Sequence, residues 1–278
     1  MVFSSVVFER FYGSPKTWRG IFALLSLGLR LARSGFLAIT SIVISVLTAI
    51  VVAIVTIVLV AKNTTTAPLH DMPIVASSAI AWGGGFTLAF ASAAHALRKD
   101  RTEGLFHLVV DRTLSLRGYV VARACGLSLL LALVVAGGTA FCGLVAIIAS
   151  ARISAVPKTL QATVAAIVFS LAFAAIVGPV SLAALGARSR IGGYLFLIGV
   201  MVLPELLVGM LAHGLPESVT ELFTVPSALG ALRSALAPGS FDPLRFVRAL
   251  AAVTVMAFLA TLVVRRDIRL LIHAGRDA

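Results

Sequence analysis

Long apolar runs alternate with short polar stretches along the whole chain. Six of these runs hold about 20 mostly apolar residues each, which matches the roughly 30 Å hydrocarbon core of a bilayer. A chain in lipid must pair its own backbone polar groups, so runs of this length predict transmembrane helices. The predicted spans cover residues 36–61, 74–97, 124–149, 163–187, 193–212 and 246–264. The pattern therefore predicts a single all-α integral membrane domain over residues 1–278.

The residues before the first span follow a helical period with two different faces. Trp18 and Leu25 lie on an apolar face, whereas Arg30 and Arg33 mark a basic one. This pattern predicts an amphipathic helix over residues 16–34 that lies in the membrane interface, with its basic side toward the headgroups. A soluble helix packed on a partner is the alternative.

Glycine and proline predict irregular places in the spans. The triplet Gly83-Gly84-Gly85 in the second span favours either close helix packing or a local break. Gly178-Pro179 predicts a kink in the fourth span. The loop over residues 213–245 is moderately apolar and holds several prolines. We expect short helices there, some of them re-entrant, with a folded cap on the outer surface as the alternative.

The basic residues predict the orientation of the chain. If the N-terminus is inside, 17 of the 23 Lys and Arg residues fall on the cytoplasmic side. Lys and Arg favour the cytoplasmic side of membrane proteins, so both termini are expected there. The net charge of +12 is spread between the apolar runs. This spacing favours anionic lipid headgroups, and not nucleic acid, as the partner of the basic residues.

The sequence carries no familiar catalytic motif. It has no phosphate-binding Gly-Lys-Ser/Thr loop, no His-Glu-x-x-His and no Gly-x-Ser-x-Gly. Cys125 and Cys142 are about 25 Å apart along one predicted helix, so they are not expected to pair. We therefore expect a protein that is not itself an enzyme, with no metal or cofactor on this chain.

The most charged stretch lies between the second and third spans, over residues 98–123. It alternates charged and apolar residues, and we expect a short helix and a turn. Apolar residues such as Leu108 are expected to hold the segment against the membrane domain. The charged residues left for a partner are Asp100, Arg101, Glu103 and Arg112.

This stretch resembles the loop after the second span in ABC-2-type exporter permeases, the six-span membrane subunits of ATP-binding-cassette transporters. The shared order is an acidic and basic pair, Glu-Gly, an apolar stretch and Arg-x-x-Ser-x-Arg. The resemblance also covers the interfacial helix, the spans and the basic tail. It implies that Glu103 and Gly104 turn into a coupling segment, that Arg112, Ser115 and Arg117 form its basic turn, and that Arg123 opens the third span. The chain departs from the family at Val109-Val110-Asp111, where a leucine pair and a proline are common.

The resemblance implies the partners and the location of the chain. The coupling segment would dock on separate ATPase subunits, which would hold ATP and Mg²⁺. A second permease chain, identical or similar, would complete the exporter in a bacterial inner membrane.

Glu205 follows Pro204 inside the predicted fifth span. An ionisable side chain at membrane depth is costly, so it normally faces the bundle interior or water. Pro204 frees a backbone carbonyl and predicts a break in the helix. The two residues are candidates for a substrate path or an outer gate. In the alternative, Glu205 lies at the outer interface and pairs with Arg233, Arg245 or Arg248.

Two other functions are open from the sequence. A secondary transporter or channel would use Glu205 as an ion or proton site. A membrane anchor would only recruit a cytoplasmic partner through residues 98–123.

Overall fold

The computed structural model describes residues 18–33, 35–62, 71–93, 116–150, 155–183, 190–211, 217–239 and 241–274. Every regular element in these ranges is helical, which confirms the predicted all-α class. The elements are α2 (Trp18–Ala32), α3 (Phe36–Ala61), α4 (Met72–Ala79), the π-helix η2 (Ile80–Gly85), α5 (Phe86–Ala93), α8 (Leu116–Ser150), α9 (Val156–Ala183), α10 (Arg190–Met201), α11 (Leu203–Leu211), α12 (Glu217–Phe223), α13 (Val225–Ala235) and α14 (Pro243–Ala274).

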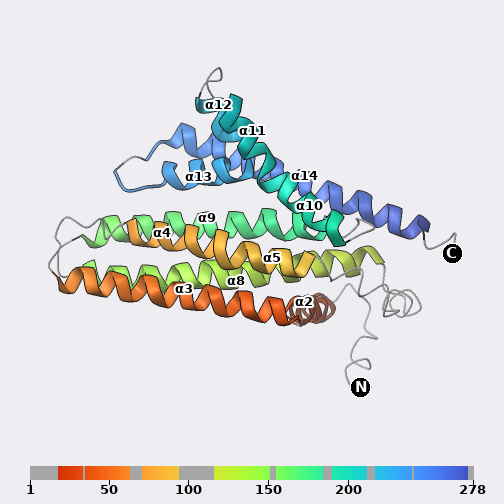
Figure 1. Ribbon diagram of the computed structural model, residues 1–278, viewed down its shortest axis with the longest axis horizontal. Helices are drawn as coiled ribbons and strands as arrows, with labels where there is room; N and C mark the ends of the chain where they lie inside the picture. The colour runs from red at the N-terminus through yellow and green to blue at the C-terminus, as the bar shows by residue number, and fades with distance from the viewer. Residues whose placement is uncertain are drawn as a thin grey trace, which may run out of the picture.

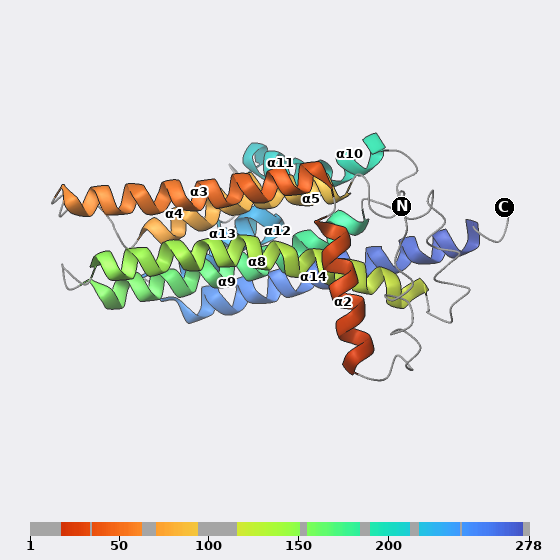
Figure 2. The ribbon, with the colours of Figure 1, turned by 90° about the horizontal axis from the view of Figure 1, so that it is seen from below.

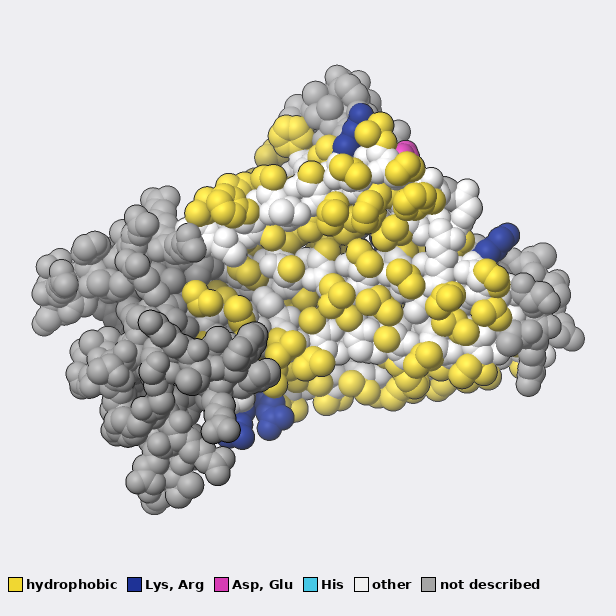
Figure 3. All heavy atoms as spheres, turned by 180° about the vertical axis from the view of Figure 1, so that it is seen from behind, with side chains coloured by type: hydrophobic (Ala, Val, Ile, Leu, Met, Phe, Trp, Pro, Cys, Tyr) yellow, Lys and Arg dark blue, Asp and Glu magenta, His cyan; other side chains and the backbone are white. Residues whose placement is uncertain are grey.

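Five helical stretches within these ranges are long and apolar enough to cross a bilayer. They are Phe36–Ala61, Met72–Ala91, Val121–Ser150, Val156–Leu182 and Pro243–Val263. Their outer faces carry many exposed apolar side chains, among them Phe36, which is 82% exposed. Figure 3 shows this apolar surface over the long helices, with the visible Lys and Arg side chains at its margins. A continuous apolar exterior marks contact with lipid, so the chain is a multi-pass helical membrane protein.

The long helices lie side by side in one bundle (Figure 1). α8 packs against α3, α4 and α9, while α14 packs against α9 and α13. Large side chains such as Leu131, Phe169 and Phe173 are fully buried between them. The bundle core is therefore centred on α8 and α9, and α13 joins it as a short helix beside α9 and α14.

Small residues allow α8 and α9 to approach closely. A Cβ atom added at Gly143 would lie 2.2 Å from Cγ2 of Thr163, and one at Gly178 would lie 2.0 Å from Oγ of Ser128. Glycine at these positions thus sets the spacing of the two helices, as in other membrane bundles. α9 continues through Pro179, where the sequence predicts a kink.

The glycine triplet of the second span has both of the predicted effects. It lies in η2, which interrupts the α-helical geometry between α4 and α5. It also packs closely, because a Cβ atom at Gly84 would lie 1.8 Å from Oγ of Ser45 on α3. A π-helical turn of this kind changes which side chains face a neighbouring helix.

The predicted fifth span is not one continuous helix. α10 ends at Met201 and α11 begins at Leu203, so the break lies at Val202, next to Pro204. Proline has no amide hydrogen and its ring crowds the preceding turn, which explains the interruption. The apolar stretch Tyr194–Met210 is also shorter than the five long ones.

α2 lies across one end of the bundle, nearly at right angles to the long helices (Figure 2). It touches α8 backbone to backbone, because a Cβ atom at Gly126 would lie 2.4 Å from the carbonyl carbon of Gly28. We call this end the α2 end. Both α8 and α14 extend past α2 there, and α14 continues to Ala274, well beyond the predicted limit of its span.

Candidate functional site

Most of the predicted coupling residues lie outside the described residues. These are Asp100, Arg101, Glu103, Gly104, Leu108, Arg112 and Ser115. The described helices fix where this connection begins and ends: α5 ends at Ala93 and α8 begins at Leu116, both at the α2 end (Figure 2). Arg117 lies in the first turn of α8. Arg123 is only 5% exposed, so its side chain packs inside the protein near the crossing with α2.

Glu205 binds hydroxyl groups at the start of α13. Thr224 donates its hydroxyl to Oε2 of Glu205, and Oγ of Ser227 lies 3.4 Å from the same oxygen. Thr224 is also the N-cap of α13, since its hydroxyl oxygen accepts a hydrogen bond from the amide of Ser227 at 3.2 Å. A carboxylate at the N-terminal end of a helix is stabilised by the helix dipole. Glu205, which follows Pro204 in the first turn of α11, therefore connects α11 to α13.

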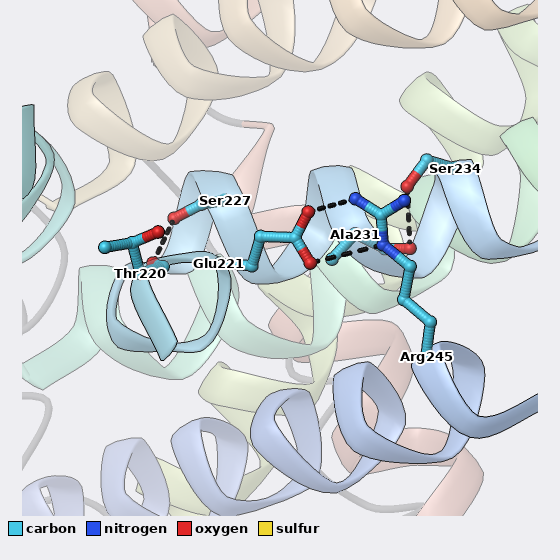
Figure 4. Close-up of polar contacts among 6 residues, drawn as sticks. All are labelled: Thr220, Glu221, Ser227, Ala231, Ser234 and Arg245. Atoms are coloured by element: carbon cyan, nitrogen blue, oxygen red, sulfur yellow. Dashed lines mark hydrogen bonds and ion pairs between the residues drawn. The ribbon is translucent and has the colours of Figure 1, made fainter. Parts of the chain in front are cut away.

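Two of the three expected arginine partners of Glu205, Arg245 and Arg233, contact other residues in the described structure. Arg245 on α14 forms a two-pronged ion pair with Glu221 on α12, in which Nε lies 3.2 Å from Oε2 (Figure 4). The side chains of Arg245 and Glu221 are 40% and 22% exposed. Arg233 on α13 contacts α4 and α9 instead. Pairing of Glu205 with hydroxyl groups was missed, although Thr224 two residues before Pro226 is a typical helix start.

A small cavity lies beside the Arg245–Glu221 pair. Its volume is about 250 Å³. Its lining residues are Glu221, Leu222, Ala231, Asp242, Leu244, Arg245 and Arg248. Asp242 caps α14, because its Oδ1 accepts from the amides of Leu244 at 2.9 Å and Arg245 at 3.1 Å. The acids in this wall thus serve local structure.

Arg233 extends from α13 into the bundle. Its Nη1 donates to Oγ of Ser78 and lies 3.4 Å from the carbonyl oxygen of Ile74, both on α4. Its guanidinium carbon lies 5.0 Å from the ring centre of Phe169 on α9, within cation–π range. Just after the C-terminal end of α13, Nε2 of Gln161 on α9 donates to the carbonyl oxygens of Leu236 and Ala237. α13 is therefore held by polar contacts at its start, along its length and at its end.

A chain of aromatic contacts continues from Phe169 toward the α2 end. Successive ring centres are 6.5 Å apart for Phe169 and Phe173, 5.3 Å for Phe173 and Trp82, 6.3 Å for Trp82 and Phe86, 6.4 Å for Phe86 and Phe90, and 4.0 Å for Phe90 and Tyr194. We call these six residues the aromatic row. Trp82, Phe86, Phe90 and Tyr194 are only partly buried. Trp82, Phe86 and Phe90 are spaced four residues apart, a spacing that places side chains on one face of a helix. The sequence alone therefore indicated this part of the row.

Both cysteines lie within the described residues. Cys125 and Cys142 are both free thiols, as expected from their separation. Sγ of Cys142 is buried, 3.3 Å from the carbonyl oxygen of Ala49. Within the described ranges, no group of three or more His, Cys, Asp or Glu residues is placed to hold a metal ion.

Comparison of the chain with protein families, with curated proteins and with solved structures finds no match.

Proposed function

We propose that this chain is the membrane-spanning permease subunit of an ATP-driven exporter of the ABC-2 type. One observation carries the proposal. The charged connection between α5 and α8 starts and finishes at the α2 end, beside an amphipathic helix that crosses the bundle there. A partner that binds this connection from the cytoplasm would act directly on the bundle.

α8 is suited to transmit such a force. It is a single helix of 35 residues that begins directly after the charged connection. It packs against α2, α3, α4 and α9, so few parts of the bundle are independent of it. A rigid element that two states of a partner can push is a common basis of transport cycles. ATP binding by the partner subunits would shift α8. Movement of α8 would in turn open or close the path that the substrate takes through the membrane.

The proposed topology places the α2 end in the cytoplasm. α10 and α11 together would make the sixth crossing, since residues 190–211 extend about 33 Å as a helix. The short helices α12 and α13 would then dip into the outer leaflet from the opposite end. This arrangement agrees with the excess of Lys and Arg that the sequence gives to the inner side.

α11 offers a surface for the second permease chain. α11 leans away from the bundle, so its apolar side chains are exposed: Leu206 is 62% exposed and Met210 is 79% exposed. In the proposed exporter, a second copy or a similar chain packs near this surface and completes the path.

The test is capture of an ATPase through the charged connection. The tagged chain is co-expressed with the P-loop ATPase of a neighbouring gene, purified in mild detergent, and the captured ATPase is quantified. Asp100→Lys and Glu103→Lys together should abolish capture, because they reverse the charges available to the partner. Glu217→Lys on α12 is the control and should leave capture unchanged.

Two results would contradict the proposal. Transport by the purified chain alone in vesicles would favour a secondary transporter or channel. Capture of the ATPase without any transport in the reconstituted complex would favour a membrane anchor.

A further inference from the structure

Arg233 holds a positive charge between α4, α9 and its own helix α13. Its guanidinium lies over Phe169, which is midway along the 28 residues of α9 and so about 20 Å from either end of that helix. The hydrocarbon core is about 30 Å thick, so this depth is inside it. Within the described part of the chain, Arg233 forms no ion pair; its contacts are a hydroxyl, a carbonyl and a ring.

One edge of the guanidinium is unused. The contacts with Ile74 and Ser78 both involve Nη1. Among the described residues, no hydrogen bond is formed by Nε or Nη2 of Arg233. These two nitrogens form the planar fork that binds the two oxygens of a carboxylate or phosphate. Arg245 provides the contrast, since its equivalent edge is occupied by Glu221.

The surroundings of Arg233 suit an amphiphile better than a small free anion. The side chain is only partly buried, so a ligand can reach it. From Phe169 the aromatic row leads away along α9 and the second span to Tyr194 on α10. Phe169 and Phe173 are fully buried, whereas the rings from Trp82 to Tyr194 are partly exposed and offer an apolar surface that an acyl chain can cover. Two buried rings thus lie between the charged group and this surface.

We propose that Arg233 binds the anionic headgroup of an amphiphile, through phosphate or carboxylate oxygens, while the tail reaches the partly exposed rings of the aromatic row, from Trp82 to Tyr194. Such a ligand would enter sideways from the bilayer. It supplies a counter-charge to a partly buried arginine that forms no ion pair among the described residues. The inference goes beyond the proposed exporter and is tested on this chain alone, so that failure of one does not decide the other.

The test uses Trp82 as a reporter inside the row. The chain has two tryptophans, and Trp18→Phe leaves Trp82 as the single emitter. The full-length variant is placed in phosphatidylcholine bilayers, and lipids with brominated acyl chains are titrated in. We expect brominated phosphatidylglycerol to quench Trp82 at about one tenth of the concentration at which brominated phosphatidylcholine does so. The preference follows from the ion pair with Arg233.

Variants separate this site from general attraction to a basic protein. Arg233→Gln should abolish the preference for phosphatidylglycerol. Arg248→Gln, an exposed arginine on α14, should retain it. Arg233→Lys keeps the charge but lacks the planar pair of nitrogens, so it should reduce the preference for phosphatidylglycerol several-fold. If Arg233→Gln does not fold, Arg233→Lys shows whether the preference depends on Arg233.

A further arm distinguishes the sources of the anion. Inorganic phosphate should compete weakly with phosphatidylglycerol and should not replace it. Equal quenching by both lipids, equal loss in the Arg233 and Arg248 variants, or full displacement by inorganic phosphate at comparable concentration would overturn the proposal. An unchanged preference in Arg233→Lys would overturn the bidentate contact.

Discussion

At the scale of single residues, polar side chains hold a short helix in place. α13 has only 11 residues, and a helix of that length is marginal by itself. Three residues fix its position. Glu205 on α11 binds the start of α13, and Gln161 on α9 binds its end. Arg233, on α13 itself, binds α4. Each contact joins parts of the chain that are far apart in sequence. The position of α13 therefore depends on a few hydrogen bonds as well as on its buried apolar face.

Loss of the cap at Thr224 should destabilise the protein. Thr224→Val removes both the N-cap of α13 and the donor to Glu205, which together are worth about 1–3 kcal/mol. Thr254→Val on α14 is the matched control, because Thr254 is exposed and bonds only within its own helix. The midpoint of thermal unfolding in detergent should fall clearly for Thr224→Val and little for Thr254→Val. Equal midpoints would mean that the contact is unimportant.

The partner of Glu205 shows what single residues in a sequence leave open. An acid in an apolar helix is costly without polar contacts, and Glu205 makes such contacts with hydroxyl groups. Arginines were the expected partners because charge attracts charge. The choice of Thr224 and Ser227 depends on the break near Pro204 and on the path of the chain through α12, which set the distance between α11 and α13. The pattern of residues within each helix does not determine the distance between α11 and α13.

At the scale of elements, the crossing of α2 and α8 depends on two glycines. Gly28 and Gly126 face each other so closely that neither has room for a methyl group. We expect Gly126→Ala to force the helices apart and to cost about 1–3 kcal/mol, as overpacking does. Gly137→Ala on the same helix has open space and should be neutral or slightly stabilising, since alanine favours helix.

Thermal unfolding of the two variants checks this expectation. Proteolysis at the α2 end gives a second measure, because a loosened α2 should be cleaved sooner in Gly126→Ala. If Gly126→Ala and Gly137→Ala have the same midpoint of thermal unfolding, α2 and α8 do not pack as closely as the backbone contact indicates.

Most helices could be predicted because each long apolar run is a local property of the chain. α3 agrees with its predicted range of 36–61 residue for residue. The break in the fifth span was also predicted, because Pro204 interrupts the helix while the apolar composition continues. The aromatic row was not predicted. Its contacts join Trp82 to Phe173 and Phe90 to Tyr194, so they depend on packing between elements.

At the scale of the whole molecule, the two ends of the bundle differ in character. At the α2 end, a helix lies across the bundle, and α8 and α14 extend past it. α8 has 35 residues, about 52 Å, and so exceeds the hydrocarbon core by about 20 Å. At the opposite end, α13 and α14 are joined by a short turn with Gly239 at a φ of 82°. The extra length of the helices therefore lies at the end where the charged connection begins.

This difference predicts which end faces the cytoplasm. Arg33, at the end of α2, and Phe241, in the turn before α14, lie at opposite ends, and the Phe241 side chain is 59% exposed. In a background with Cys125→Ser and Cys142→Ala, single cysteines replace Arg33 or Phe241. A membrane-impermeant thiol reagent added to intact cells should label Phe241→Cys and should label Arg33→Cys only after the membrane is opened. The expectation follows from the preference of Lys and Arg for the cytoplasmic side. The reverse pattern would place the charged connection outside the cell, where no ATPase is supplied with ATP, and both the topology and the proposed exporter would fail together.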